Sequence, residues 1–392
     1  MGYAGLILRS SLHWTSHRPM PPFLPAFATT IAWAKPRALP IAVPSPKRYY
    51  PFCRGLMIAL PTWYLEPHWI LAIIFLVVGF YVLIKGADVL VEAAVSLAQR
   101  SGLSTAVIGA TVVAFGTSLP ELVVCLTSMV QAQRLDNPGA ADIAMANVVG
   151  SNISNIALIL GIAALWRVLP VPASCRRLDY PVMVVATLLM IVVSLPLFGG
   201  PAVVSRGQGL ILGAGLLIFV GASVALGRRS PVIPEDIPAT QRHHPGTAIG
   251  LVIVGMILMT VGGDVALTGA ISIADTIGMS ERVIGLTVVA IGTSLPELAT
   301  SIQAARRGHT AIAIGNVIGS NIFNCLFIVG TASMIMPIPI APQNWMWDYW
   351  WMLGFTLIIA PMMLWSGRIQ RWHGVLLLIL LTAYLASLFV VT

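Results

Sequence analysis

Charged residues are scarce in this chain of 392 residues, since Asp, Glu, Lys and Arg together make up 9% of it. Ordinary soluble domains carry about 25% of these residues, so the composition excludes a typical soluble protein. Hydrophobic residues reach 57% instead. Only helices and closed barrels satisfy their backbone hydrogen bonds inside a bilayer, and long apolar runs in such a chain predict an all-α integral membrane protein.

Acidic residues are missing from the start of the chain, where Glu66 is the first. The segment before it holds seven of the 22 basic residues, which leaves 15 basic against 14 acidic residues from position 57 onward. This balance gives no basis for a nucleic-acid partner. Residues 1–56 are rich in proline and fit neither a signal peptide nor a folded domain. We expect this tail to be disordered or untranslated, with translation starting at Met57.

Cysteine and histidine are few and poorly placed for chemistry. The four cysteines show no paired metal-binding spacing, and the seven histidines lie in the tail, in loops or at the ends of apolar runs. A membrane-embedded hydrolase with Ser118 or Ser294 as nucleophile would therefore lack an obvious general base at membrane depth. Zinc and copper sites are disfavoured in the same way, and no resident cofactor is expected.

Ten apolar runs are long enough to cross a hydrocarbon core, which takes about 20 residues. They lie at 69–91, 103–131, 141–166, 180–198, 207–227, 248–274, 282–305, 310–337, 347–365 and 374–391. If the first run starts outside, the inner loops hold eleven arginines and the outer loops three. The positive-inside rule then places both termini outside the cell membrane, which we expect to be a prokaryotic inner membrane.

Two sequence motifs occur twice in the chain. GATVVAFGTSLPEL (109–122) matches GLTVVAIGTSLPEL (285–298) at 12 of 14 positions. NVVGSNISN (147–155) matches NVIGSNIFN (316–324) at seven of nine. The chain is therefore predicted to contain an internal duplication.

Each copy of the motifs belongs to a set of five runs, and five is odd, so the second set must enter the membrane from the opposite side. Inverted repeats with interrupted helices at the midplane are an architecture of secondary transporters. The predicted parts after the tail are a first repeat (57–227), a cytoplasmic linker loop (228–247) and a second, inverted repeat (248–392).

Glu121 lies inside an apolar run, where a carboxylate costs about 3 kcal/mol on insertion scales. Pro120 lacks an amide hydrogen and clashes with the preceding turn, so the helix should break around residues 114–120. Thr117 and Ser118 come four and three residues before the glutamate, which lets their oxygens gather on its face. The second copy repeats this pattern with Thr293, Ser294 and Glu297.

Two carboxylates and four hydroxyls meeting at a pseudo-twofold axis would offer many oxygens and a charge of −2. Calcium takes 6 to 8 oxygen ligands in flexible geometry, whereas magnesium demands a stricter octahedron. The alternative interpretation of S-x-x-E is an ordinary helix capping box. Two inverted copies, each with an acid inside a membrane span, favour a cation site over that alternative.

The second motif contributes small polar residues at four-residue spacing. Such residues can simply pack helices together in a bilayer, and that interpretation stays open for Asn147, Asn152, Asn316 and Asn321. The better candidates for lining a site are pairs four residues apart on one helix face. These pairs are Ser151 with Asn155 and Ser320 with Asn324.

The doubled phrases GTSLPEL and GNVIGSNIFN resemble the α-repeats of the cation/calcium antiporter superfamily, specifically its prokaryotic sodium/calcium exchanger branch. The resemblance implies that Glu121 and Glu297 bind calcium together with Thr117 and Thr293. It also implies flanking sodium sites, which use Ser118, Ser294, Ser151, Ser320 and the carbonyls of Ala114 and Ala290. Asn155 and Asn324 would line the middle of the site.

One departure narrows the expected activity. Potassium-dependent relatives carry Asp where this chain has Asn324, which argues against potassium coupling, and the proton-coupled branch has acids where this chain has Ser and Asn. The function predicted is a sodium/calcium antiporter that works by alternating access. A cation channel is the main alternative, but channels normally build glutamate rings by subunit symmetry. The oligomeric state stays open.

Asp88 and Asp264 also match between the two halves, at the ends of the first and sixth runs. Their position near a span end favours a structural or interfacial role. Lys85 lies one turn from Asp88 and is the expected partner of that carboxylate.

Overall fold

The computed structural model describes residues 69–134, 138–196, 202–227, 244–279, 288, 290–340 and 344–391. The predicted tail (1–56) lies outside these residues, as does most of the predicted linker. The described residues are almost entirely helical. The longer helices are α2 (Trp69–Ser101), α5 (Leu119–Arg134), α6 (Pro138–Ser154), α8 (Tyr180–Ser194), α9 (Arg206–Gly227), α10 (Pro245–Thr276), α13 (Leu295–Arg307), α14 (Thr310–Phe323), α16 (Tyr349–Ile358) and α17 (Arg371–Val391).

Shorter elements complete the chain. The short α-helices are α3 (Thr105–Ile108), α4 (Ala114–Thr117), α7 (Leu160–Trp166), α12 (Ala290–Thr293) and α15 (Val329–Ile335). Two-residue strands form two antiparallel pairs, in which β1 (Leu169–Pro170) meets β4 (Arg368–Ile369) and β2 (Val203–Val204) meets β3 (Ile338–Pro339). Each strand pair joins the first half of the chain to the second.

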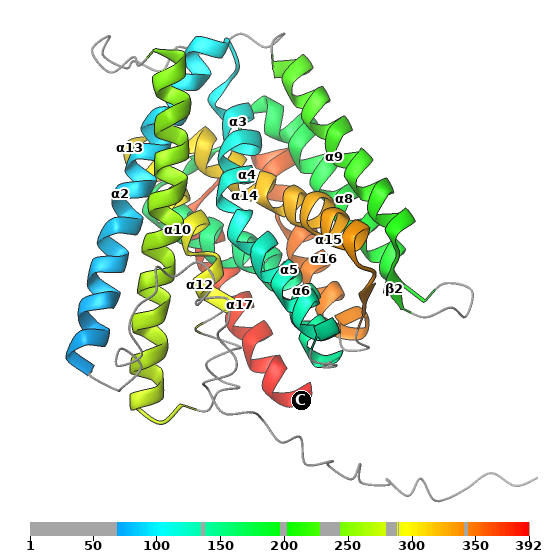
Figure 1. Cartoon of the computed structure of the whole chain (residues 1–392). Helices are drawn as coiled ribbons and strands as arrows, with labels where there is room; N and C mark the ends of the chain where they lie inside the picture. The colour runs from blue at the N-terminus through cyan, green and yellow to red at the C-terminus, as the bar shows by residue number, and fades with distance from the viewer. Residues whose placement is uncertain are drawn as a thin grey trace, which may run out of the picture. The chain divides into compact units, whose positions relative to one another are not determined.

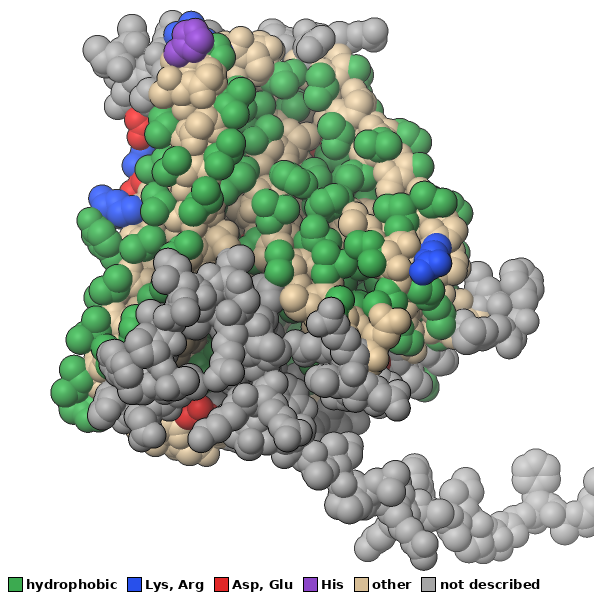
Figure 2. Space-filling model, in the orientation of Figure 1, with side chains coloured by type: hydrophobic (Ala, Val, Ile, Leu, Met, Phe, Trp, Pro, Cys, Tyr) green, Lys and Arg blue, Asp and Glu red, His purple; other side chains and the backbone are tan. Residues whose placement is uncertain are grey.

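Within the described residues, nine helical stretches are long and apolar enough to cross a membrane, and each overlaps a predicted run. The remaining predicted run, 282–305, falls partly on residues that the structure does not describe, so the count of ten stays a prediction. Helix α10 begins at Pro245, two residues before the predicted end of the linker at 247. Apolar side chains dominate the face shown in Figure 2, with charged groups near its edges, as expected for a surface that contacts lipid.

Helices α2 and α10 pack along each other (Figure 1), and their backbones approach closely where glycines face the partner helix. A Cβ atom added to Gly79 would lie 2.2 Å from the Ala266 nitrogen, and one added to Gly262 would lie 2.4 Å from the Leu83 nitrogen. Small residues allow this close approach of helices in membranes. The pair therefore forms one tightly fitted unit beside the other helices.

The predicted helix interruption is present in both halves, and it is narrower than expected. Helix α4 ends at Thr117 and α5 begins at Leu119, so Ser118 alone forms the turn, with φ −86° and ψ 3°. In the second half, Ser294 separates α12 from α13 with φ −91° and ψ 8°. Proline is tolerated in the first turn of a helix, where its missing amide hydrogen has no partner to lose. One residue is therefore enough to restart each helix.

Helix α14 occupies the interior of the fold. The most apolar 18 residues within Thr310–Ile335 are 94% buried, whereas those within Arg206–Gly227 are 22% buried. The described residues contain six π-helical segments. Two of them, Asn155–Ile159 and Asn324–Ile328, follow α6 and α14 and begin at matching asparagines. Such segments are rare and often occur at functional sites, which directs attention to this central region.

Candidate functional site

Glu121 and Glu297 lie in the first turns of α5 and α13. Each is only 1% exposed. Among the described residues, neither carboxylate takes part in an ion pair, and the Oε2 atom of each has no hydrogen-bond partner. The positive end of each helix dipole lies next to the carboxylate and partly offsets its charge. Two buried acids thus remain without a basic partner.

Hydroxyl groups surround the two carboxylates. Ser118 Oγ donates to Glu297 Oε1 across 3.3 Å, which joins the first half to the second. The Thr117 hydroxyl also lies near the Glu297 carboxylate, and the Ser151 hydroxyl lies near that of Glu121. The two carboxylates are close enough for their charges to repel each other. The structure therefore brings both glutamates and these three hydroxyls into one cluster.

Asn316 links the two halves around this cluster. Thr117 Oγ1 donates to Asn316 Oδ1 across 3.2 Å, and Asn316 Nδ2 donates to the backbone oxygen of Glu297 across 3.4 Å. Asn147 makes both matching bonds in the other half, to Thr293 Oγ1 and to the Glu121 backbone oxygen, each at 3.4 Å. Each asparagine thus holds its own glutamate segment against the threonine of the opposite half, which is more specific than general packing.

The remaining hydroxyls bridge the halves as well. Ser294 Oγ lies 3.5 Å from Ser151 Oγ, and Thr117 Oγ1 lies 3.5 Å from Ser320 Oγ. The Ser294 side chain makes no capping hydrogen bond with its own helix. The capping-box alternative therefore does not describe this serine, whose hydroxyl points to the opposite half instead.

The backbone hydrogen bond made by the turn serine differs between the two halves. The Ala114 oxygen accepts the Ser118 N–H across 3.1 Å and the Thr117 hydroxyl across 3.3 Å. In the second half, the Ser294 N–H donates to Ile291, one residue after Ala290. The turn around Ser294 is thus one residue tighter than the turn around Ser118.

Four asparagines, namely Asn152, Asn155, Asn321 and Asn324, form a layer that hydrogen bonds join across the two halves. All four are at most 1% exposed. Asn155 Nδ2 donates to Asn321 Oδ1, and Asn324 Nδ2 donates to Asn152 Oδ1, each across 3.0 Å. The Oδ1 atoms of Asn155 and Asn324 have no hydrogen-bond partner among the residues that the structure describes, so two amide oxygens also remain unsatisfied here.

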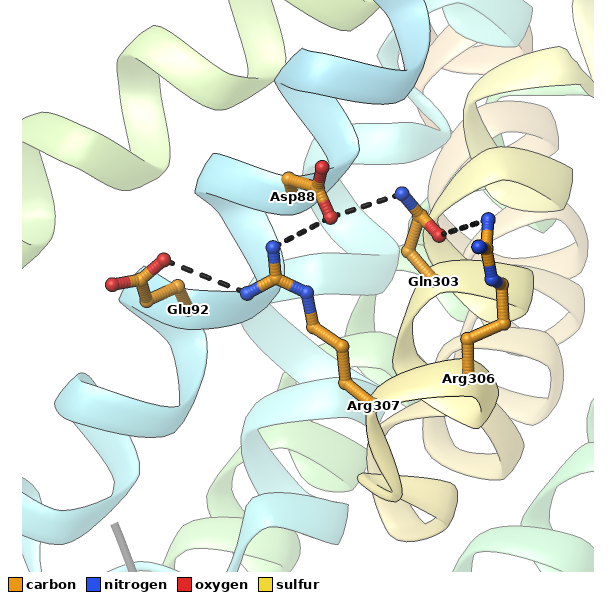
Figure 3. Close-up of polar contacts among 5 residues, drawn as sticks. All are labelled: Asp88, Glu92, Gln303, Arg306 and Arg307. Carbon is orange, nitrogen blue, oxygen red and sulfur yellow. Dashed lines mark hydrogen bonds and ion pairs between the residues drawn. The ribbon is translucent and has the colours of Figure 1, made fainter. Parts of the chain in front are cut away.

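A separate polar cluster connects α2 to the end of α13 (Figure 3). Arg307 Nη2 lies 2.7 Å from Asp88 Oδ1, and Arg307 Nη1 lies 3.5 Å from Glu92 Oε2. Gln303 donates to the same Asp88 oxygen across 2.9 Å. The expected partner of Asp88 was Lys85, and this prediction was wrong: Lys85 Nζ lies 5.8 Å from the centre of the Tyr81 ring. The carboxylate pairs instead with an arginine 219 positions away.

The oxygen-rich composition of the carboxylate cluster restricts the ions that it can hold. No group of three or more His, Cys, Asp or Glu side chains with metal-binding geometry occurs among the described residues. Cys125, Cys175 and Cys325 are buried and free. Carboxylate, hydroxyl and amide oxygens suit hard cations, and calcium tolerates their irregular arrangement.

Comparison with known proteins identifies the family. The family model described as sodium/calcium exchanger protein matches residues 71–225 and 247–390. The putative antiporter CaxA of Alkalimonas amylolytica is 35% identical over 81% of this chain and 97% of its own length. The sodium/calcium exchanger MaX1 of Methanosarcina acetivorans is 30% identical over 80% of this chain and 97% of its own length.

Solved structures agree with this result. The sodium-calcium exchanger NCX_Mj, soaked with 10 mM Na+ and zero Ca2+, superimposes with a TM-score of 0.68 at 31% identity. The match covers 82% of this chain and 99% of that structure. The doubled motifs, the two interrupted helices and these similarities agree, and the chain belongs to the sodium/calcium exchanger family of membrane antiporters.

Proposed function

We propose that this protein exchanges Na+ for Ca2+ across the membrane, with both ions bound in turn at a site between Glu121 and Glu297. The burial of these two glutamates, with no basic partner in the part of the chain that the structure describes, carries the proposal. An unpaired charge at membrane depth costs several kcal/mol, and a bound cation removes that cost. The unpartnered Oε2 atom of each carboxylate is available as a ligand.

The proposed calcium ligands are the two glutamates with Thr117 and Thr293, which approach from opposite halves of the chain. Both threonine hydroxyls already bond the asparagines that hold the glutamate segments, so their positions are fixed relative to the carboxylates. The proposed sodium ligands are Ser118, Ser294, Ser151, Ser320, Asn155 and Asn324, with the carbonyls of Ala114 and Ala290. Because the two ions share one region, binding of one displaces the other.

Exchange then follows from charge. Two fixed negative charges oppose the conformational change that opens the site to the other side of the membrane unless cations neutralise them. The protein therefore makes this change when the site holds cations and not when the site is empty. Helices α2 and α10 form the tightly packed unit that we propose shifts against the remaining helices.

Both termini are proposed to lie outside the cell, with Arg167, Arg306 and Arg307 on the inner side. These residues gather in the structure, since the Arg306 guanidinium stacks over the Trp166 ring and Arg167 lies beside Gly308.

Calcium uptake in proteoliposomes tests the proposal. With sodium inside and none outside, the wild-type protein should accumulate calcium, and potassium or proton gradients should not replace sodium. Glu121→Gln and Glu297→Gln keep the side-chain size but remove the charge, so both should abolish uptake while the purified protein stays monodisperse. Ser333→Ala serves as the control, because this buried serine lies outside both motifs and bonds only the Gly330 carbonyl of its own helix among the hydrogen bonds of the described residues. Near-normal exchange in both glutamine variants would refute the proposed site.

A further inference from the structure

The four buried asparagines differ in their hydrogen bonds, and the difference divides them into two pairs. Asn155 and Asn324 each leave Oδ1 without a partner, whereas Asn152 and Asn321 use both ends of their amides. The pairs correspond across the internal repeat, at the same offset of 169 positions. This division indicates two distinct roles within one layer.

The orientation of the Asn321 amide is set by a group that can only accept a hydrogen bond. Asn321 Nδ2 donates to the backbone oxygen of Asn152 across 3.3 Å. A carbonyl has no hydrogen to give, so the nitrogen end of the amide must lie there. The oxygen end must then lie on the other side, where it accepts Asn155 Nδ2. This leaves the Asn155 amide one orientation, with Oδ1 pointing away from Asn321.

The same sequence of constraints applies to the other pair. Asn152 Nδ2 lies 3.5 Å from the thioether sulfur of Met352 and 3.1 Å from the Cys325 sulfur. A thioether is a weak acceptor and cannot donate, so the nitrogen end of Asn152 is fixed on this side. Asn152 Oδ1 therefore accepts Asn324 Nδ2, and Asn324 Oδ1 is left facing away from Asn152. Met183 occupies the matching place beside Asn321, with its sulfur 3.7 Å from Nδ2.

Both unsatisfied oxygens belong to residues that share a helix face with the hydroxyl cluster. Asn155 lies four residues after Ser151, and Asn324 lies four residues after Ser320, which is one helical turn. Ser151 Oγ lies 3.5 Å from the Ser294 hydroxyl, and Ser320 Oγ lies 3.5 Å from the Thr117 hydroxyl. An amide turned the other way would present two N–H donors to this region and would repel a cation.

We propose that Asn152 and Asn321 are positioning residues: they hold the amides of Asn324 and Asn155 so that both Oδ1 atoms face the bound cations. Each positioning residue serves the ligand of the opposite half, so the two halves are coupled through this layer. The inference rests on the proposed function, because it assigns these amide oxygens to the same ion site. It goes beyond helix packing, because simple packing requires no particular amide orientation.

Asn321→Leu is the principal test, since leucine is close in size and removes both hydrogen bonds. The half-saturating calcium concentration for sodium-driven uptake should rise about 10- to 100-fold, the usual effect of losing a residue that orients a metal ligand. Asn152→Leu should act similarly through Asn324. Ser333→Ala, which loses the buried hydroxyl bonded to the Gly330 carbonyl, should leave the half-saturating concentration unchanged.

A second substitution separates positioning from structural damage. Unlike an amide, a carboxylate presents an oxygen in either of its two flipped orientations. Asn155→Asp combined with Asn321→Leu should therefore restore at least half of the lost calcium affinity, measured on a logarithmic scale. In an otherwise wild-type chain, Asn155→Asp should not raise the calcium affinity. The reason is that a carboxylate oxygen would then face Asn321 Oδ1, which in the wild type accepts a hydrogen bond from Asn155 Nδ2. If leucine prevents folding, Asn321→Ser removes the same amide with less bulk.

The outcomes are distinguishable from those of the proposed function. Absence of sodium-driven calcium uptake by the wild-type protein would defeat the proposed function itself. Wild-type exchange together with an Asn321 variant that keeps its calcium affinity within twofold, or that Asn155→Asp fails to improve, would overturn the positioning role alone. Calcium-dependent thermal stabilisation of the purified variants provides a second measure of affinity that does not require transport.

Discussion

Replacing Gly262 by alanine tests the close packing of α2 against α10. The added Cβ would lie 2.4 Å from the Leu83 nitrogen and 2.9 Å from the Gly79 oxygen. Ordinary van der Waals contact begins at 3.4 Å, so the shortfall at Leu83 is 3.4 − 2.4 = 1.0 Å. Both nearest atoms belong to backbone and cannot rotate away. The two helices must therefore separate along their contact.

The expected cost follows from overpacking, which destabilises proteins by about 1–3 kcal/mol. Gly250 in the same helix has nothing within 4 Å of its added Cβ, so Gly250→Ala is a matched control. Alanine favours helix over glycine by up to about 1 kcal/mol at either position, and this gain cancels in the comparison. The difference in unfolding free energy between the two variants should then be about 1–3 kcal/mol, with Gly262→Ala the less stable.

Equilibrium denaturation of both variants in detergent micelles measures this difference directly. Sodium-driven calcium uptake, measured alongside, should fall in Gly262→Ala and stay at the wild-type level in Gly250→Ala, because we propose that α2 and α10 move as one fitted unit. Equal stability of the two variants, within about 0.5 kcal/mol, would refute the reasoning, since overpacking of backbone against backbone should exceed that value.

Two further predictions concern charge and burial. Arg307→Gln removes the ion pairs to Asp88 and Glu92, in which the arginine side chain is 39% exposed. The unfolding free energy should therefore fall by less than about 1 kcal/mol, and the loss should shrink in high salt. A loss of several kcal/mol that does not depend on salt would contradict this. The three cysteines in the described part of the chain are at most 1% exposed. A Cys53→Ser protein, which keeps only these three cysteines, should therefore not react with a membrane-impermeant maleimide until it is denatured. Rapid labelling of the folded protein would show that the three cysteines are not buried.

The helix interruptions were accessible from sequence because their causes are local. Pro120 determines where its helix can restart, and the apolar residues around Glu121 mark that acid as exceptional. Both features rest on chemistry within one turn of helix. The same features recur around Glu297, and the structure has the interruption at both places.

Contacts between distant segments could not be predicted in the same way. Local spacing favoured Lys85 as the partner of Asp88, but Arg307 takes that role because α13 ends beside α2. The bonds from Asn147 and Asn316 to the threonines of the opposite half likewise depend on how the two halves fit together. Spacing along one helix shows which side chains share a face, and it carries no information about the element opposite that face.

The π-helical segments were also beyond the sequence patterns. Asn155 and Asn324 begin the two central segments, where neither proline nor glycine marks the start, although Gly109 and Pro361 begin two of the others. Both central segments contact α14. Asn152 and Asn321 could therefore be recognised as small polar residues of a membrane helix, but their distinct hydrogen bonds became visible only in the folded protein.

The position of the bound calcium tests the central claim most directly. Crystals of the full chain grown with calcium should give one strong anomalous difference peak between the carboxylates of Glu121 and Glu297, with oxygen atoms of both within about 2.3–2.6 Å. The peak should disappear in crystals of Glu121→Gln. A dominant peak elsewhere, or a calcium ion held by only one of the two glutamates, would contradict the account.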